Sequence, residues 1–159
     1  MPRSRLLAAT ALTFTVATAA LTGARSGDAA STKRVVTDCC ELRVPAAMQV
    51  STNGNEAQGR WGDLNIQVRA SEASSAADAV DRVVADNGFG RATYRTSSSQ
   101  WAVKSGYYEG EGIYYVRAEF DRGCGLSGTL VITYPKANRG RYDASIATMS
   151  KSFRSDLCG

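Results

Sequence analysis

The sequence predicts an α+β domain in which helices pack on one antiparallel sheet. Residues 64–70 and 113–134 alternate between apolar and polar side chains, as strands with one buried face do. Residues 76–84 and 142–153 instead carry apolar side chains at helical spacing. Strand segments follow one another through short glycine turns, which favours antiparallel pairing and an α+β layered fold.

The first strands follow a small, polar stretch at 25–34, "RSGDAASTKR". Short strand segments are then separated by the turn signals "NGN" at 53–55 and "WGD" at 61–63. The next strand has Leu64, Ile66, Val68 and Ala70 on one face and Asn65, Gln67 and Arg69 on the other. One face of this strand is therefore expected to be buried.

A helix is expected to begin after Ser75. Asp78 stands three residues later, where a capping box has Glu or Gln, so the pair resembles that motif with Asp in its place. Gly88 follows Asn87 at the predicted end and supplies the left-handed conformation that helix exits favour. The apolar residues of this helix are Ala76, Ala79, Val80, Val83 and Val84.

Residues 91–134 are predicted to form an antiparallel meander. Strands at 91–97 and 100–107 lead to the hairpin loop "EGEG" at 109–112, and a strand from Ile113 follows. Gly123 and Gly125 mark the next turn, and the last strand ends at Pro135.

A second helix closes the chain. Tyr142, Ile146, Met149 and Phe153 recur at steps of four, three and four. Asp143 lies near its start and Lys151 and Arg154 near its end, which suits the helix dipole.

Three segments give the chain a resemblance to a known family: "KSGYYEGEGIYYVRAEF" as a hairpin, "LVITYP" as the last strand and "YDASIATMSKSF" as the closing helix. Over residues 41–155 they resemble the PsbP-like family of α/β/α sandwich domains, among them small exported bacterial proteins of unassigned role. The resemblance implies a noncatalytic accessory or docking domain. Some members bind metal through histidine, and this chain has no histidine. We therefore expect neither a metal nor a cofactor.

The N-terminus reads as an export signal. Arg3 and Arg5 precede an uncharged stretch at 6–21, and small residues follow. The stretch is shorter than the roughly 20 apolar residues of a membrane span and is diluted by threonine. We expect residues 1–24 to be a signal peptide cleaved after Ala24, residues 25–38 a flexible lead, and residues 39–159 a single domain. The mature protein would then be periplasmic or extracellular, without a membrane span.

Charge argues against a nucleic-acid partner. The formal net charge of +4 falls to +2 without Arg3 and Arg5. The remaining basic residues are scattered, whereas binding to a phosphate backbone needs a concentrated basic stripe.

The chain has four cysteines: Cys39, Cys40, Cys124 and Cys158. In an oxidising compartment they are expected to pair. A bond between Cys39 and Cys40 would be strained, because disulfides usually join Cα atoms roughly 4.4 to 6.8 Å apart. An extended segment would instead point the two side chains to opposite faces. We therefore expect the doublet to be joined to Cys124 and Cys158, with the assignment of partners left open. A zinc site is the competing interpretation, and the lack of histidine disfavours it.

The candidate binding residues surround the EGEG loop. They are Tyr108, Glu109, Glu111, Tyr115 and Arg117. Tyr115 and Arg117 share one strand face, which is a candidate contact patch if no helix covers it, because aromatic residues gather at interfaces. Core packing is the simpler interpretation of Tyr114 and Trp101.

Catalysis is the alternative. Lack of histidine removes Ser-His-Asp and Cys-His mechanisms. A carboxylate pair, Glu109 with Glu111 or Glu119 with Asp121, would still suit a histidine-free hydrolase. A secreted inhibitor or effector is a third interpretation. The favoured prediction is a noncatalytic binding module whose partner is a protein or another envelope component.

Overall fold

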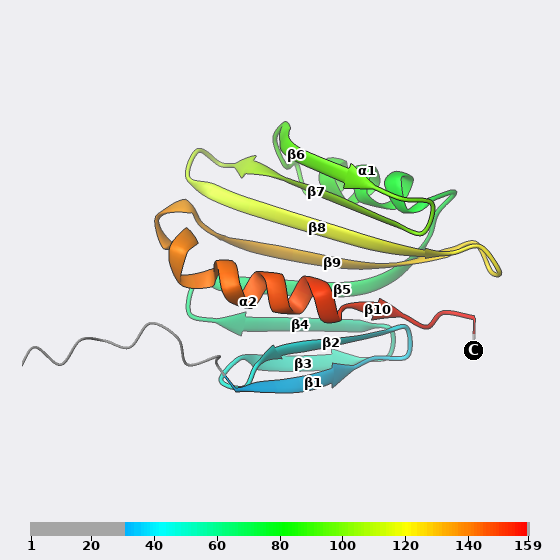
Figure 1. The fold of residues 1–159 in the computed structure, drawn as a ribbon, viewed down its shortest axis with the longest axis horizontal. Helices are drawn as coiled ribbons and strands as arrows, with labels where there is room; N and C mark the ends of the chain where they lie inside the picture. The colour runs from blue at the N-terminus through cyan, green and yellow to red at the C-terminus, as the bar shows by residue number, and fades with distance from the viewer. Residues whose placement is uncertain (1–30, 159) are drawn as a thin grey trace, which may run out of the picture.

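Residues 31–158 are described by the computed structural model. A seven-stranded antiparallel sheet forms its centre, in the order β3-β4-β5-β9-β8-β7-β6. Figure 1 shows α2 crossing one face of this sheet while α1 lies on the opposite face. The helices are α1 (Ala76–Asp86) and α2 (Arg139–Ser152), the latter preceded by a short 3-10 turn at Lys136–Asn138. The strands of the sheet are β3 (Gln49–Asn53), β4 (Glu56–Trp61), β5 (Leu64–Glu72), β6 (Ala92–Ser97), β7 (Trp101–Tyr108), β8 (Gly112–Asp121) and β9 (Leu126–Pro135).

This architecture confirms the predicted fold class. The meander from β6 to β9 and the two helices lie where the sequence placed them. The structure differs from the prediction of one sheet, because it has a second sheet of three strands. These strands are β1 (Thr32–Val36), β2 (Cys40–Pro45) and β10 (Arg154–Ser155). None of the helices within residues 31–158 is long and apolar enough to cross a membrane.

Each face of the large sheet packs on its own core. On the α2 face, Leu64, Ile66 and Val68 of β5 are buried, as their alternation predicted. Tyr142, Ile146 and Met149 of α2 and Phe153 complete that core. On the α1 face, the core contains Ala76, Ala79, Val80 and Val83 of α1 with Tyr114, Val116 and Ala118 of β8. Because the two helices lie over different parts of the sheet, each face also has a part without a helix over it.

Local signals explain where α1 begins and ends. The Ser75 Oγ accepts a hydrogen bond of 3.1 Å from the Asp78 N–H, as an N-cap does. The Asp78 carboxylate accepts from the Ser74 N–H at 2.9 Å, so it extends the cap one residue further back than a capping box would. Gly88 has φ +64°, which confirms its predicted role at the helix exit.

Part of the expected flexible lead is ordered. Thr32–Val36 forms β1, which pairs with β2, and Val35 is only 6% exposed. The polar composition of residues 25–34 hid this strand, because only one of its side chains enters the core. The predicted signal peptide, residues 1–24, lies outside the described residues.

The expected double staple of Cys39 and Cys40 is wrong. Cys124 is bonded to Cys158, with their Cα atoms 5.9 Å apart, while Cys39 and Cys40 are free and buried. The chain bends at residues 38 and 39 instead of running extended, so the two neighbouring side chains do not point to opposite faces. Strand pairing of β2 with β1 and β10 holds the N-terminal segment, and the disulfide fastens the C-terminal segment to the β8–β9 turn.

Candidate functional site

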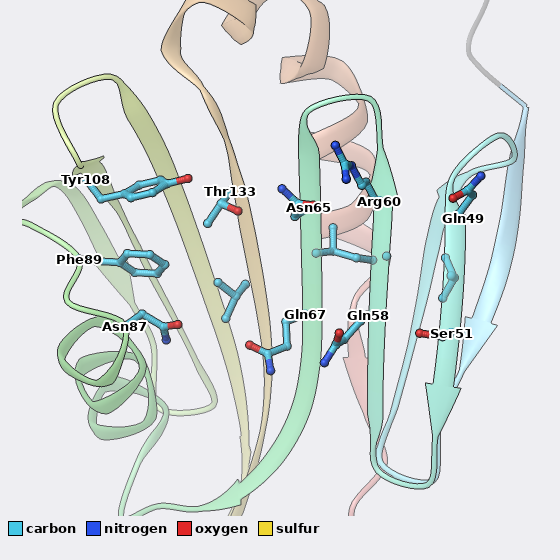
Figure 2. A pocket seen from close by; sticks show the side chains of 14 residues that line it. Gln49, Ser51, Gln58, Arg60, Asn65, Gln67, Asn87, Phe89, Tyr108 and Thr133 are labelled. Atoms are coloured by element: carbon cyan, nitrogen blue, oxygen red, sulfur yellow. The ribbon is translucent and has the colours of Figure 1, made fainter.

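An uncovered part of the sheet lies beside α1. This helix packs on β7, β8 and β9, so the same face of β3, β4 and β5 has no helix over it. A groove of about 700 Å³ occupies the uncovered area. Figure 2 shows its side chains rising from neighbouring strands, with α1 along one side. We call this feature the amide groove.

The floor of the amide groove consists of two rows that cross the strands. In the first row, Ser51, Gln58, Gln67 and Val131 are successive cross-strand partners on β3, β4, β5 and β9. In the second row, the partners are Gln49, Arg60, Asn65 and Thr133. All eight line the groove. Period-two alternation places them together, because their chain neighbours Ala57, Leu64 and Ile66 point into the α2-side core.

An aromatic wall closes the groove on the α1 side. The ring of Phe89, just after α1, stacks on the buried Tyr114 with centroids 4.6 Å apart and planes 6° from parallel. The tilted ring of Tyr108 also packs against Phe89, with centroids 5.3 Å apart. Asn87 completes this side, and its Nδ2 donates to the Val83 carbonyl at 2.8 Å. Packing against Tyr114 and Tyr108 therefore orients the Phe89 ring.

Several polar groups of the groove have no partner within the protein. In the described part of the chain, the side chains of Gln49, Gln58 and Gln67 make no hydrogen bond to another protein group. Arg60 donates only to the Gly62 carbonyl, at 3.1 Å, and the amide of Asn65 reaches the Asp63 carbonyl at 3.5 Å. A side-chain amide offers two donors and an acceptor. The floor can therefore donate to and accept from the same bound molecule.

The groove carries little charge. Its lining residues include one cation, Arg60, and no carboxylate. Its size falls within the roughly 300 to 1,000 Å³ of ligand pockets. Its amide, hydroxyl and aromatic side chains have the means to bind and orient a polar molecule.

The structure separates the residues that the sequence grouped around the EGEG loop. Tyr108 lines the amide groove, whereas Tyr115 and Arg117 lie on the opposite face of the sheet. Glu109 and Glu111 are exposed in the turn between β7 and β8, and Glu109 has φ +46°. The hairpin register, which pairs Tyr108 with Gly112, causes the separation, because Tyr115 lies an odd number of residues further along β8.

Helix α2 contacts Tyr115 on this face, and the contact patch expected at Tyr115 and Arg117 stays a prediction. The Tyr115 hydroxyl lies 2.6 Å from the Ser150 Oγ on α2, and its ring packs against the α2-side core. Arg117 is bound to Glu119 at 2.7 Å, with both side chains less than a fifth exposed. Tyr115 does border a smaller cavity of about 310 Å³ together with Tyr94, Tyr107 and Tyr134.

The predicted carboxylate pair of Glu119 and Asp121 lines a separate cavity at the ends of β7 and β8. Both groups have partners within the protein. Glu119 accepts from Arg117 and from the Ser155 N–H at 3.1 Å, and Asp121 accepts from the Gly123 N–H at 2.8 Å. These carboxylates therefore stabilise the chain ends around them.

Asp121 also lies beside the disulfide, with its carboxylate within 4.8 Å of the sulfurs of Cys124 and Cys158. Metal binding by cysteine needs the thiolate. The Cys124–Cys158 bond takes both thiols out of that role. This cluster is therefore no metal site while the disulfide is formed.

Sequence reasoning placed only Tyr108 of the groove among the candidate residues. The missed signal is the recurrence of amide and hydroxyl side chains at alternate positions on three successive strands, from Gln49 to Gln67. Taken alone, each of these strands has the pattern of an ordinary solvent-exposed face. The pattern becomes a site only because α1 stands at one edge of it.

No protein family and no curated protein sequence matches this chain. Its fold is similar to that of the Ran-binding protein Mog1p from Saccharomyces cerevisiae, at 13% identity and a TM-score of 0.57, covering 78% of this chain and 95% of that one. It is also similar to cyanobacterial PsbP (CyanoP) from Synechocystis sp. PCC 6803, at 16% identity and a TM-score of 0.57, covering 80% of this chain and 94% of that one. The chain therefore has a PsbP/Mog1-like fold.

Proposed function

We propose that this protein is an exported, noncatalytic binding module that holds a neutral, hydroxyl-rich polymer, a glycan of the envelope or the extracellular space, in the amide groove. The observation that carries the proposal is the pair of polar rows across β3, β4, β5 and β9, which ends at the aromatic wall. This proposal selects the polymer among the partners that the sequence left open.

The chemistry of the rows suits hydroxyl groups. A sugar hydroxyl both donates and accepts, and the unpartnered amides of Gln49, Gln58 and Gln67 do the same. Thr133 and Ser51 add hydroxyls of their own. At the wall, Tyr108 and Phe89 offer apolar ring surface for the C–H side of a sugar ring.

The shape of the floor suits a segment of a chain. Four adjacent strands at ~4.8 Å spacing span about 14 Å, and residues two apart on a strand are separated by about 7 Å. The floor is therefore longer than it is wide. Strands β4, β5 and β9 are paired on both sides, so over most of the floor a ligand meets side chains.

Charge supports a neutral ligand over an acidic one. Arg60 is the single cation in the lining, and a nucleic acid would need several phosphate contacts. The lack of carboxylates in the lining likewise supports binding over glycoside hydrolysis, which uses a pair of them.

Export is part of the proposal and rests on the sequence of residues 1–24. The Cys124–Cys158 disulfide supports it, because disulfides persist in oxidising compartments. Mog1p is named for binding Ran, so the fold serves binding in at least one other protein. For this chain we place the binding surface in the amide groove.

The proposal is tested by depletion from solution on insoluble neutral polysaccharides, namely cellulose, chitin and a β-glucan. At least one should retain the protein, and retention should persist when the salt concentration is raised, because no ion pairs are involved. The double variant Gln58→Ala/Gln67→Ala should lose retention by about tenfold, from two hydrogen bonds at ~0.5 to 1.5 kcal/mol each. Gln100→Ala is the matched control, since Gln100 is an exposed glutamine outside the groove. Retention on none of the three, or equal retention of both variants, would overturn the proposal.

A further inference from the structure

The cysteine doublet lies away from the amide groove and has no part in the proposed binding function. Cys39 is at the bend after β1, and Cys40 begins β2. The two sulfurs are 2.6 Å apart, against ~2.05 Å for a disulfide bond. The residues are 2% and 3% exposed, so their surroundings fix this arrangement.

Hydrogen bonds from three directions hold the bend. Thr37 donates its N–H to the Cys40 carbonyl at 2.9 Å, and its Oγ1 accepts from the Cys40 N–H at 3.1 Å. Asp38 donates its N–H to the Gly54 carbonyl in the β3–β4 turn, at 3.1 Å. From the C-terminal segment, the Asp156 N–H donates to the Cys39 carbonyl at 2.9 Å. These hydrogen bonds to the backbone of the bend therefore hold the two sulfurs close together.

A cavity borders the pair. A cavity of about 310 Å³ lies against the bend, and both cysteines line it. The Thr37 Oγ1 lies 3.3 Å from the Cys39 sulfur. Charged residues around the pair are Arg34, Asp38, Glu41, Glu119, Arg154 and Asp156.

One thiol is better prepared to react than the other. The contact with the Cys40 thiol, assisted by the Thr37 hydroxyl and opposed by burial, lowers the pKa of Cys39 to about 7. The Cys39 sulfur also lies 3.1 Å from the Asn55 carbonyl, to which its thiol can donate. The same contact, together with burial, raises the pKa of Cys40. Cys39 is therefore the nucleophile of the pair and Cys40 the resolving thiol, because the thiolate is the attacking species.

We propose that Cys39 and Cys40 form a thiol–disulfide exchange site, which small disulfides oxidise to a bond between the two neighbours. The Cys39 thiolate attacks the small disulfide RSSR, giving a mixed disulfide on Cys39 and releasing RS⁻. The Cys40 thiol then loses its proton to RS⁻ and attacks the Cys39 sulfur, closing the ring and releasing a second thiolate. One RSSR is reduced to two RSH, and the two protein thiols are oxidised.

The bond is expected to be readily reduced. Neighbouring Cα atoms across a trans peptide are ~3.8 Å apart, below the usual disulfide range, and such strain favours the reduced form. The pair would therefore cycle between open and closed forms, whereas Cys124–Cys158, with Cα atoms 5.9 Å apart, lies within the usual range. Strain thus makes a Cys39–Cys40 bond easier to reduce than Cys124–Cys158, but it does not prevent that bond from forming.

Peptide mapping tests this directly, because trypsin leaves both cysteines in one peptide, residues 35–43, and puts Cys124 and Cys158 in the peptides 123–136 and 155–159. Folded protein is treated with oxidised glutathione, denatured, alkylated and digested. Peptide 35–43 should appear unalkylated and lighter by two hydrogens, and should take two alkyl groups after reduction. Any of three results for peptide 35–43 would overturn the proposal. They are two alkyl groups without reduction, a stable glutathione adduct, and a cross-link to peptide 123–136 or 155–159.

Two single variants complete the test. Cys40→Ala should trap glutathione on Cys39, since no thiol remains to resolve the adduct. Cys39→Ala lacks the nucleophile, so it should react with oxidised glutathione at least tenfold more slowly than the unchanged protein. This variant also tests the assigned roles if Cys40→Ala does not fold. A rate for Cys39→Ala equal to that of the unchanged protein would contradict the assigned roles.

Discussion

The Tyr115 hydroxyl on β8 and the Ser150 Oγ on α2 lie 2.6 Å apart, at the contact between α2 and the large sheet. This pair ties the second helix to the sheet and leaves Tyr115 half-buried. Tyr115→Phe would leave the Ser150 hydroxyl, 8% exposed, without this partner. An unsatisfied buried hydroxyl costs about 1 to 3 kcal/mol, so urea unfolding should show that loss.

Tyr107→Phe is the matched control for Tyr115→Phe. Tyr107 is 40% exposed, so its hydroxyl can be hydrated, and removing it should change the free energy of unfolding by less than about 0.5 kcal/mol. Equal effects of the two changes would mean that the contact with Ser150 does not stabilise α2.

The Cys124–Cys158 disulfide is expected to stabilise the folded protein. It closes a loop with a sequence separation of 34, which restricts the unfolded chain by up to about 4 kcal/mol in the entropy model. The double variant Cys124→Ala/Cys158→Ala should therefore unfold at a lower urea concentration. A bond between Cys39 and Cys40 encloses almost no chain, so closing it should leave the unfolding midpoint nearly unchanged. A large rise on closing that bond would go against this account.

Oxidation of the doublet should depend on pH through Cys39. Its pKa is lowered to about 7, so the thiolate fraction, and with it the rate of attack on oxidised glutathione, should be half-maximal near pH 7 and fall at lower pH. An ordinary cysteine reaches this point near pH ~8.5. Cys40→Ala removes the main cause of the lowering, so the midpoint for the first attack should move up. A midpoint that stays near pH 7 in Cys40→Ala would show that another group activates Cys39.

The aromatic wall gives a prediction for the amide groove. Tyr108→Ala should weaken retention on the bound polysaccharide severalfold, since an aromatic contact contributes about 0.5 to 1.5 kcal/mol. Tyr107→Ala, on the neighbouring position of β7 and outside the groove, should leave retention unchanged. Circular dichroism of both variants separates a loss of ligand contact from a loss of fold.

Much of the fold could be predicted from periodicity. The alternation from Leu64 to Ala70 and the N-cap at Ser75 are local signals. The structure has β5 and α1 at these positions. Strand β1 could not be found in this way, since Val35 is its single buried residue. Its order depends on pairing with β2, which the local sequence does not encode.

The site and the cysteines were harder to predict for a related reason. Whether Gln58 and Gln67 face bulk water or a groove depends on where α1 packs, which is on the strands beyond β5 in the sheet. Which sulfurs meet depends on a bend at residues 38 and 39, where alternation along a strand no longer applies. The resemblance to the PsbP-like family indicated the fold and was silent on both.

The most direct test of the groove is a nuclear magnetic resonance titration of the isotope-labelled protein with a soluble oligomer of the polysaccharide that retains it. The account predicts shifts at the side-chain amides of Gln49, Gln58 and Gln67 and at the backbone of Phe89 and Tyr108, with little change around Tyr94 and Tyr107 on the opposite face. Shifts confined to that opposite face, with the glutamine amides unmoved, would contradict it.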